Sequence, residues 1–92
     1  MIKSFRHKGL KDFFETGTLK GIQPKHAKRL EIILDLLNAA ADVKDVNFPG
    51  SNLHTLKGNR IGYWAVSVSG NWRITFKFIQ GHPCDVDYED YH

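Results

Sequence analysis

Apolar side chains in the first part of the chain recur at the spacing of an amphipathic helix. Leu10, Phe13 and Phe14 lie at positions i, i+3 and i+4, which predicts a short helix ending near Gly17. Before this helix, residues 2–5 begin and end with an apolar residue, Ile2 and Phe5, which indicates a short opening strand. The chain therefore begins with one brief strand and one brief helix.

A longer apolar stripe begins at Pro24 and predicts a second helix over about residues 24–40. Proline is favoured in a first helical turn, because the amide hydrogen that it lacks has no partner there. Charged and polar side chains occupy the opposite side of the same helix, so one face is suited to a core. The stripe consists of Ala27, Leu30, Leu34, Leu37 and Ala41, with Ile33 beside it.

The second half of the chain alternates apolar and polar residues, as strands do. The apolar positions form two runs, Trp64, Val66 and Val68, and then Trp72, Ile74, Phe76 and Phe78. A loop of two residues between these runs, Gly70 and Asn71, would put the first run on the face of Arg73. A loop of three residues that includes Ser69 pairs Val68 with the start of the second run and puts both runs on one face. We therefore expect a hairpin with the three-residue loop.

The polar residues of this hairpin share its other face, which we expect to be accessible to a charged substrate. They are Ser67, Arg73, Thr75 and Lys77. After a reversal near residues 81–83, a last strand is predicted over residues 84–88. The predicted fold class is α+β, with an antiparallel sheet and two N-terminal helices packed on one of its faces, in one domain over residues 1–92.

Charge adds a weak indication of the partner, and the cysteine count excludes some classes of protein. Residues 1–84 carry 13 basic and 6 acidic side chains, a surplus that suits a polyanion such as RNA but also describes an ordinary solvated face. The one cysteine, Cys84, has no partner for an internal disulfide and no neighbours at zinc-finger spacing. No secretory or membrane-spanning run is recognisable, so we expect a soluble, cytoplasmic chain without a membrane partner.

Two histidines and several cations supply the groups that RNA cleavage without a metal requires. The ribose 2′-hydroxyl is an internal nucleophile, so a base, an acid and a cation for the phosphate suffice. His54 and His92 are candidates for proton transfer, and Arg73 and Lys57 are candidates for holding the phosphate. Taken singly, each residue is explained as well by a polar loop, an exposed strand position or a solvated acidic tail.

The C-terminal segment permits two further interpretations. The α-carboxylate and Asp90 would favour the imidazolium form of His92 and raise its pKa, provided that the tail packs on the body of the protein. Alternatively, Asp85, Asp87, Asp90 and His92 are ligands of a divalent metal in a nuclease. No second acidic cluster lies earlier in the chain, so we expect neither a metal nor another cofactor.

Five segments together resemble the HigB toxins of bacterial type II toxin-antitoxin modules, in the RelE/ParE superfamily. They are residues 1–10 (MIKSFRHKGL), 53–60 (LHTLKGNR), 62–64 (GYW), 71–76 (NWRITF) and 88–92 (YEDYH). The resemblance covers nearly the whole chain, and its most specific part is the combination of Asn71-Trp72-Arg73 with the terminal Asp90-Tyr91-His92. It implies a compact RelE-like α+β fold and an mRNA interferase that cuts translated messages on the ribosome. It also implies a helix-turn-helix antitoxin, HigA, as partner.

The resemblance also assigns roles to particular positions. The residues that match His54, Asp90, Tyr91 and His92 are implicated in cleavage, and those that match Lys57 and Arg73 lie near the phosphate. Arg60 and Lys77 complete the set of cations that we expect to contact RNA. Two other functions stay open: a toxin of the ParE branch, which poisons DNA gyrase by binding without catalysis, and a basic RNA-binding module.

Overall fold

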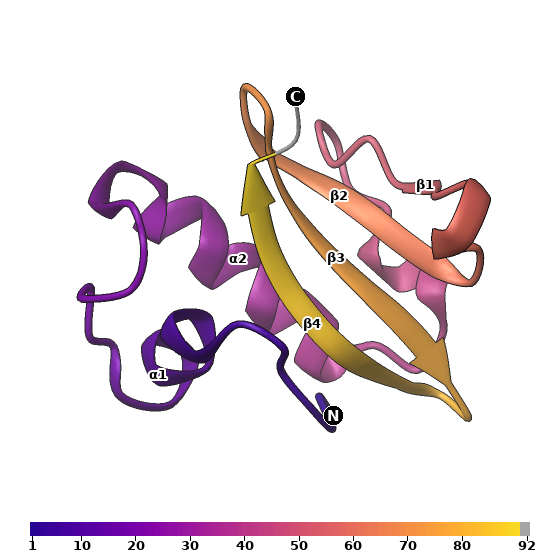
Figure 1. The fold of residues 1–92 in the computed structure, drawn as a ribbon. Coiled ribbons are helices and arrows are strands. Elements are labelled where there is room, and N and C mark those ends of the chain that lie inside the picture. Colours follow the sequence, from indigo (N-terminus) through magenta and orange to yellow (C-terminus); the bar gives the residue numbers. More distant parts are fainter. Residues whose placement is uncertain (91–92) are drawn as a thin grey trace.

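The computed structural model describes residues 1–90, which form two α-helices and a four-stranded antiparallel sheet (Figure 1). The strands lie in the order β1-β2-β3-β4, so each strand pairs with its neighbour in the sequence. The predicted α+β fold class is therefore confirmed. The elements are α1 (Lys8–Thr16), α2 (Ala27–Ala39), β1 (His54–Thr55), β2 (Tyr63–Ser69), β3 (Trp72–Ile79) and β4 (His82–Asp90), with 3-10 turns at Pro24–His26, Val43–Val46 and Gly58–Arg60.

Both predicted helices are present, and local side chains explain where they begin and end. Nδ1 of His7 caps α1 by accepting a hydrogen bond of 2.9 Å from the amide of Leu10. Gly17 ends the helix in the left-handed conformation, with φ 81°, which residues with a side chain rarely adopt. The second helix begins as predicted at Pro24, but its first turn is a 3-10 turn and α2 proper starts three residues later.

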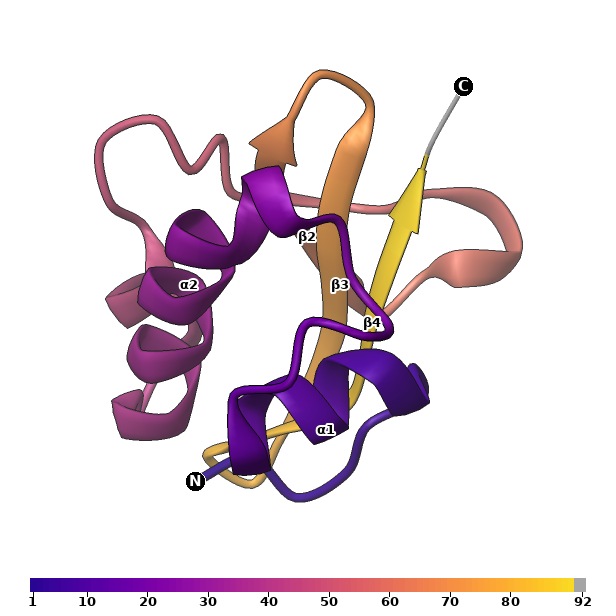
Figure 2. The same cartoon turned by 90° about the vertical axis from the view of Figure 1, so that its left-hand side faces the viewer.

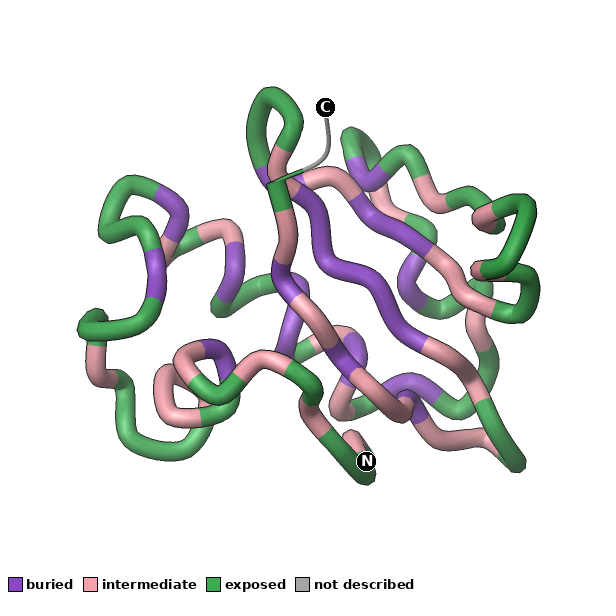
Figure 3. Tube along the Cα trace, viewed as in Figure 1, coloured by how far each residue is buried: buried purple, intermediate pink, exposed green. Residues whose placement is uncertain are grey.

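The helices lie on one side of the sheet, α2 across its face and α1 nearer the β4 edge (Figures 1 and 2). Between them and the sheet lies the apolar core, in which the centre of β3 is buried (Figure 3). Burying an aliphatic or aromatic side chain contributes about 1.5–3 kcal/mol, so this layer supplies most of the driving force for folding. Its fully buried members are Leu10, Leu30, Ile33, Leu37, Val46, Val66, Ile74, Phe76 and Val86.

The hairpin of β2 and β3 has the predicted faces but not the predicted loop. Its loop has two residues, because Ser69 and not Val68 pairs with Trp72. A β-bulge between Ser67 and Ser69 adds Val68 to β2, and this extra residue reverses the alternation once. Both apolar runs therefore still face the core. The pairs that show this are Trp64 with Phe76 and Val66 with Ile74.

The ends of the chain also differ from expectation. The predicted opening strand amounts to one isolated parallel bridge between Phe5 and Val86, supported by hydrogen bonds from Arg6 and to Ser4 along β4. The last strand is longer than residues 84–88, because its pairing with β3 continues to Asp90. Among the residues that the structure describes, no helix is long and apolar enough to cross a membrane.

Candidate active site

A charged pocket of about 360 Å³ lies where β1 and the turn that follows it meet the start of β3. Residues 54–57 and Arg60 come from one segment before the hairpin, and Arg73 comes from its second strand. The pocket thus joins two of the segments that the sequence singled out. Its lining consists of His54, Thr55, Leu56, Lys57, Arg60 and Arg73.

His54 is exposed, and its ring is oriented by the backbone two residues earlier. Nδ1 lies 2.7 Å from the carbonyl oxygen of Asn52, a residue in the left-handed conformation with φ 50°. A carbonyl oxygen can only accept, so Nδ1 carries the hydrogen of this bond. Nε2 is then the proton acceptor of the neutral ring, as a general base requires.

Arg73 lies in β3 directly opposite Glu89 of β4, and the two side chains form an ion pair on the face away from α2. Nε and Nη2 of Arg73 donate hydrogen bonds of 3.2 and 3.0 Å to Oε1 of Glu89. Only 11% of the Arg73 side chain is exposed, against 24% for Glu89. The guanidinium is therefore held in a largely dry position by a carboxylate on the neighbouring strand.

Arg60 reaches the same carboxylate from the 3-10 turn before β2. Its Nη1 donates a hydrogen bond of 2.6 Å to Oε1 of Glu89, and its Nη2 donates one of 3.2 Å to Oε2. Nη2 also lies 3.5 Å from Oγ1 of Thr75, and the guanidinium packs over the ring of Tyr63 at 5.6 Å. One glutamate thus holds two arginines.

This arrangement corrects the expectation that the polar face of the hairpin is accessible. Thr75 is fully buried and Arg73 is 9% exposed, and Arg60, from the turn before β2, contacts Thr75 while Glu89 pairs with Arg73. Burial of such groups is tolerated when they are paired, and here each has a partner.

The charges of this cluster are stabilised by one another. Burial alone would raise the pKa of Glu89, but the hydrogen bonds from Arg60 and Arg73 outweigh it and hold that pKa below its ordinary value. The bond to Glu89 in turn raises the pKa of Arg60, against the opposing effect of burial. Glu89 is therefore ionised at neutral pH, and one carboxylate against two guanidinium groups leaves a net positive charge at the pocket.

A second polar pair anchors β4 on the core side. The hydroxyl of Tyr88 lies 2.6 Å from Nδ1 of His26 and accepts a hydrogen bond of 3.4 Å from the amide of Gln23. Burial, with a smaller effect of Lys25, lowers the pKa of His26, and burial raises the pKa of Tyr88. A neutral His26 that accepts a hydrogen bond from the hydroxyl of Tyr88 agrees with both pKa shifts. This bond fixes β4 one residue before Glu89.

The remaining candidates lie outside the pocket or outside the described residues. Lys77 packs over the ring of Tyr63, with Nζ 4.9 Å from the ring centroid, and does not line the pocket. Asp90 is exposed at the end of β4, opposite Trp72. Tyr91 and His92, with the expected position and raised pKa of His92, lie outside the described residues.

Comparison with known proteins identifies the family. A family model described as the RelE-like toxin of the type II toxin-antitoxin system HigB matches residues 3–92. The chain belongs to this HigB-like toxin family. It is also 46% identical to the Endoribonuclease HigB of Proteus vulgaris, in an alignment that covers 100% of both chains. Membership of a toxin-antitoxin family implies an antitoxin as partner, and neither match favours the ParE-like alternative.

Glu89 is the residue of this toxin that the sequence pattern does not single out. It stands in an acidic tail, and the predicted last strand stops at Tyr88. One signal was available: if the alternation of Val86 and Tyr88 continues, residue 89 falls on the face of Arg73. The pairing itself depends on the register between β3 and β4, which the sequence does not define.

The alternative metal site gains no support from the described residues. The carboxylate of Asp85 accepts hydrogen bonds from Ser4 and Tyr63, at 3.5 and 3.3 Å. Within residues 1–90, no three histidine, cysteine or acidic side chains are grouped as metal ligands would be.

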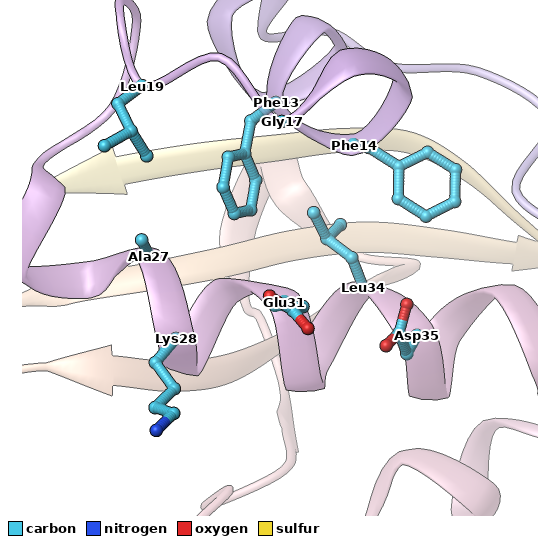
Figure 4. A pocket seen from close by; sticks show the side chains of 9 residues that line it. All are labelled: Phe13, Phe14, Gly17, Leu19, Ala27, Lys28, Glu31, Leu34 and Asp35. Carbon is cyan, nitrogen blue, oxygen red and sulfur yellow. The ribbon is translucent and has the colours of Figure 1, made fainter.

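A larger cavity of the toxin, about 610 Å³, lies between α1 and α2 (Figure 4). Phe13 and Phe14 project into it from α1, and α2 contributes Leu34 beneath them. Its lining includes charged Lys28, Glu31 and Asp35 but neither histidine nor arginine. The groups suited to proton transfer and phosphate binding are instead those of the smaller pocket.

Proposed function

We propose that this chain is an endoribonuclease that cuts mRNA on the ribosome without a metal and so inhibits translation. The observation that carries the proposal is the convergence of His54 with Lys57, Arg60 and Arg73 around one pocket. The whole-length relative from Proteus vulgaris, named an endoribonuclease, supports the same activity. A toxin that acts only by binding gyrase would not require an oriented histidine beside these cations.

In this proposal His54 acts as the general base. Its Nε2 takes the proton of the ribose 2′-hydroxyl, whose oxygen then attacks the adjacent phosphorus. The charge that develops on the phosphoryl oxygens is stabilised by Lys57 and by the two arginines. As the bond to the 5′ oxygen breaks, that oxygen receives a proton, and the products are a 2′,3′-cyclic phosphate and a 5′-hydroxyl.

The remaining roles follow the family resemblance. His92 supplies the proton for the leaving oxygen, with Asp90 and Tyr91 beside it, and Lys77 contributes to RNA binding beyond the pocket. The antitoxin is a helix-turn-helix protein of the HigA type, and the site of action is the translating ribosome in the cytoplasm. The basic surplus of residues 1–84 suits a substrate held among ribosomal RNA.

Cleavage of a defined mRNA on programmed ribosomes tests the proposal. The unmodified chain is expected to cut the message to a 2′,3′-cyclic phosphate and a 5′-hydroxyl, and His54→Ala is expected to lower the rate by about 100-fold or more, the loss typical of a missing general base. Because His54 is exposed, the melting temperature of the His54→Ala variant should hardly differ from that of the unmodified chain. The control is His82→Ala, because His82 lies at the start of β4 and does not line the pocket.

Three results would count against the proposal. Equal rates for His54→Ala and the unmodified chain would exclude His54 as the base, and 3′-hydroxyl and 5′-phosphate ends would point to a metal-activated water as the nucleophile. Intact messages together with broken, gyrase-linked DNA would favour the ParE-like alternative.

A further inference from the structure

We propose that Glu89 is a positioning residue: its carboxylate holds the guanidinium groups of Arg60 and Arg73 side by side at the pocket, where they meet the scissile phosphate. The inference rests on the proposed ribonuclease function and adds a residue to its machinery. Glu89 itself is not among the described residues that line the pocket, although both of its arginine partners are. It therefore acts through them and does not touch the RNA.

The geometry shows why one carboxylate can organise both cations. Oε1 of Glu89 accepts from Nη1 of Arg60 at 2.6 Å and from Nη2 of Arg73 at 3.0 Å, so a single oxygen bridges the two groups. The second contacts, from Nη2 of Arg60 to Oε2 and from Nε of Arg73 to Oε1, fix the plane of each guanidinium. Paired hydrogen bonds of this kind define orientation as well as distance.

Electrostatics explains why the negative charge is needed as well as the shape. Two guanidinium groups that approach the same oxygen repel each other, and Arg73 is largely withdrawn from water. An intervening carboxylate attracts both groups and offsets one of their two positive charges, which lowers the cost of holding Arg73 away from water. Glu89 thus holds the two positive groups side by side before the phosphate binds. Without Glu89, the phosphate, with its one negative charge, would have to bring the two groups together.

One other role for Glu89 fits the site less well, and a second is separated from positioning by the direction of the rate change. A general base needs an oxygen that is available to a proton, but both oxygens of Glu89 accept hydrogen bonds from arginine. The lowered pKa of Glu89 also makes it a poor proton acceptor near neutral pH. The second role is competition with the phosphate for the two arginines. In that role Glu89 would slow the reaction, and its replacement would accelerate cleavage.

The test compares Glu89→Gln with the unmodified chain in single-turnover cleavage of mRNA on programmed ribosomes, with the toxin titrated to saturation. Glutamine keeps the shape and loses the charge. We expect the maximal rate constant to fall about 10- to 100-fold, because the arginines stabilise the transition state, and the half-saturating concentration to change less than about threefold. The matched control is Glu31→Gln, an exposed glutamate on α2 whose replacement should leave both values unchanged.

A double-mutant cycle separates positioning from general damage to the fold. If Glu89 acts through Arg73 as well as Arg60, then Glu89→Gln should cost less rate when added to Arg73→Gln than when added to the unmodified chain, since one of the two groups to be positioned is already gone. Should Glu89→Gln melt below the assay temperature, Glu89→Asp keeps the charge on a shorter side chain. In the same assay, Glu89→Asp is expected to lower the maximal rate constant and to leave the half-saturating concentration unchanged.

Several outcomes would overturn the inference. These are an unchanged or increased rate in Glu89→Gln, a change confined to the half-saturating concentration, and losses that multiply fully in the double variant. If the unmodified chain does not cut mRNA on ribosomes, the proposed function fails first, and the inference fails with it. If it does cut and Glu89→Gln is equally active, only the inference fails.

Discussion

The two faces of the sheet bury their side chains by different means. On the face toward α2, Ile74 and Phe76 are fully buried among apolar neighbours. On the other face, Arg73 is nearly as inaccessible, but it is held by Glu89 and shares that partner with Arg60. The first face is stabilised by contact area, which has no direction, whereas the second depends on hydrogen bonds between particular atoms.

This difference determines how each face tolerates change. Apolar neighbours can repack around a substitution of similar volume, so the cost depends chiefly on the space left empty. Removing one member of a buried ion pair instead leaves an uncompensated charge. A site built on the polar face is therefore precise but easily disturbed, and the apolar face beneath it supplies the rigidity.

The largest expected effect on stability lies on the apolar face. Phe76→Ala should lower the free energy of unfolding by about 3–5 kcal/mol, because it opens a cavity in the centre of the core. Urea denaturation followed by tryptophan fluorescence measures the change. Phe76→Leu, which fills most of the space, should lose much less. Equal losses in the two variants would show that cavity volume is not what limits this face.

A smaller and pH-dependent effect is expected on the polar face. Glu89→Gln should lower the free energy of unfolding at neutral pH by about 1–3 kcal/mol, between the values for exposed and buried pairs. Because the pKa of Glu89 is lowered on folding, its contribution is present above the ordinary value of 4.5 and is lost as the pH falls through the folded value.

Urea denaturation across this acidic range therefore tests whether the stabilisation by Glu89 is lost as the pH falls. The unmodified chain should approach the stability of Glu89→Gln as the pH falls. The control is Asp12→Asn, which removes the exposed Lys8–Asp12 pair and should change little at neutral pH. A constant difference between Glu89→Gln and the unmodified chain at every pH would mean that charge does not stabilise this face.

The apolar face was predictable from the sequence to a much greater extent than the polar one. The stripe of α2 and the alternation of β2 and β3 identify the core, because period alone decides which side chains share a face. Even the unforeseen bulge at Val68 preserves this result, since it keeps Trp64 and Val66 on the same side as Ile74.

The polar face depends on contacts that no local pattern contains. Bringing Arg60 to Glu89 requires the turn before β2 to fold over the sheet, and β4 to pair with β3 up to Asp90. His54 could be proposed from its residue type and the family motif, but the carbonyl of Asn52 that orients its ring depends on a left-handed backbone. The two-residue strand β1 is too short for alternation to indicate it.

The chemistry of the cut shows whether the ribose 2′-hydroxyl is the nucleophile. The toxin is added to ribosomes carrying either an all-ribose mRNA or the same mRNA with a 2′-deoxyribose on the 5′ side of the cleaved bond. If His54 activates the 2′-hydroxyl, the first message is cut to a 2′,3′-cyclic phosphate and a 5′-hydroxyl, and the second is not cut at that bond. Cleavage of both messages, with 3′-hydroxyl and 5′-phosphate ends, would show that His54 does not activate the 2′-hydroxyl.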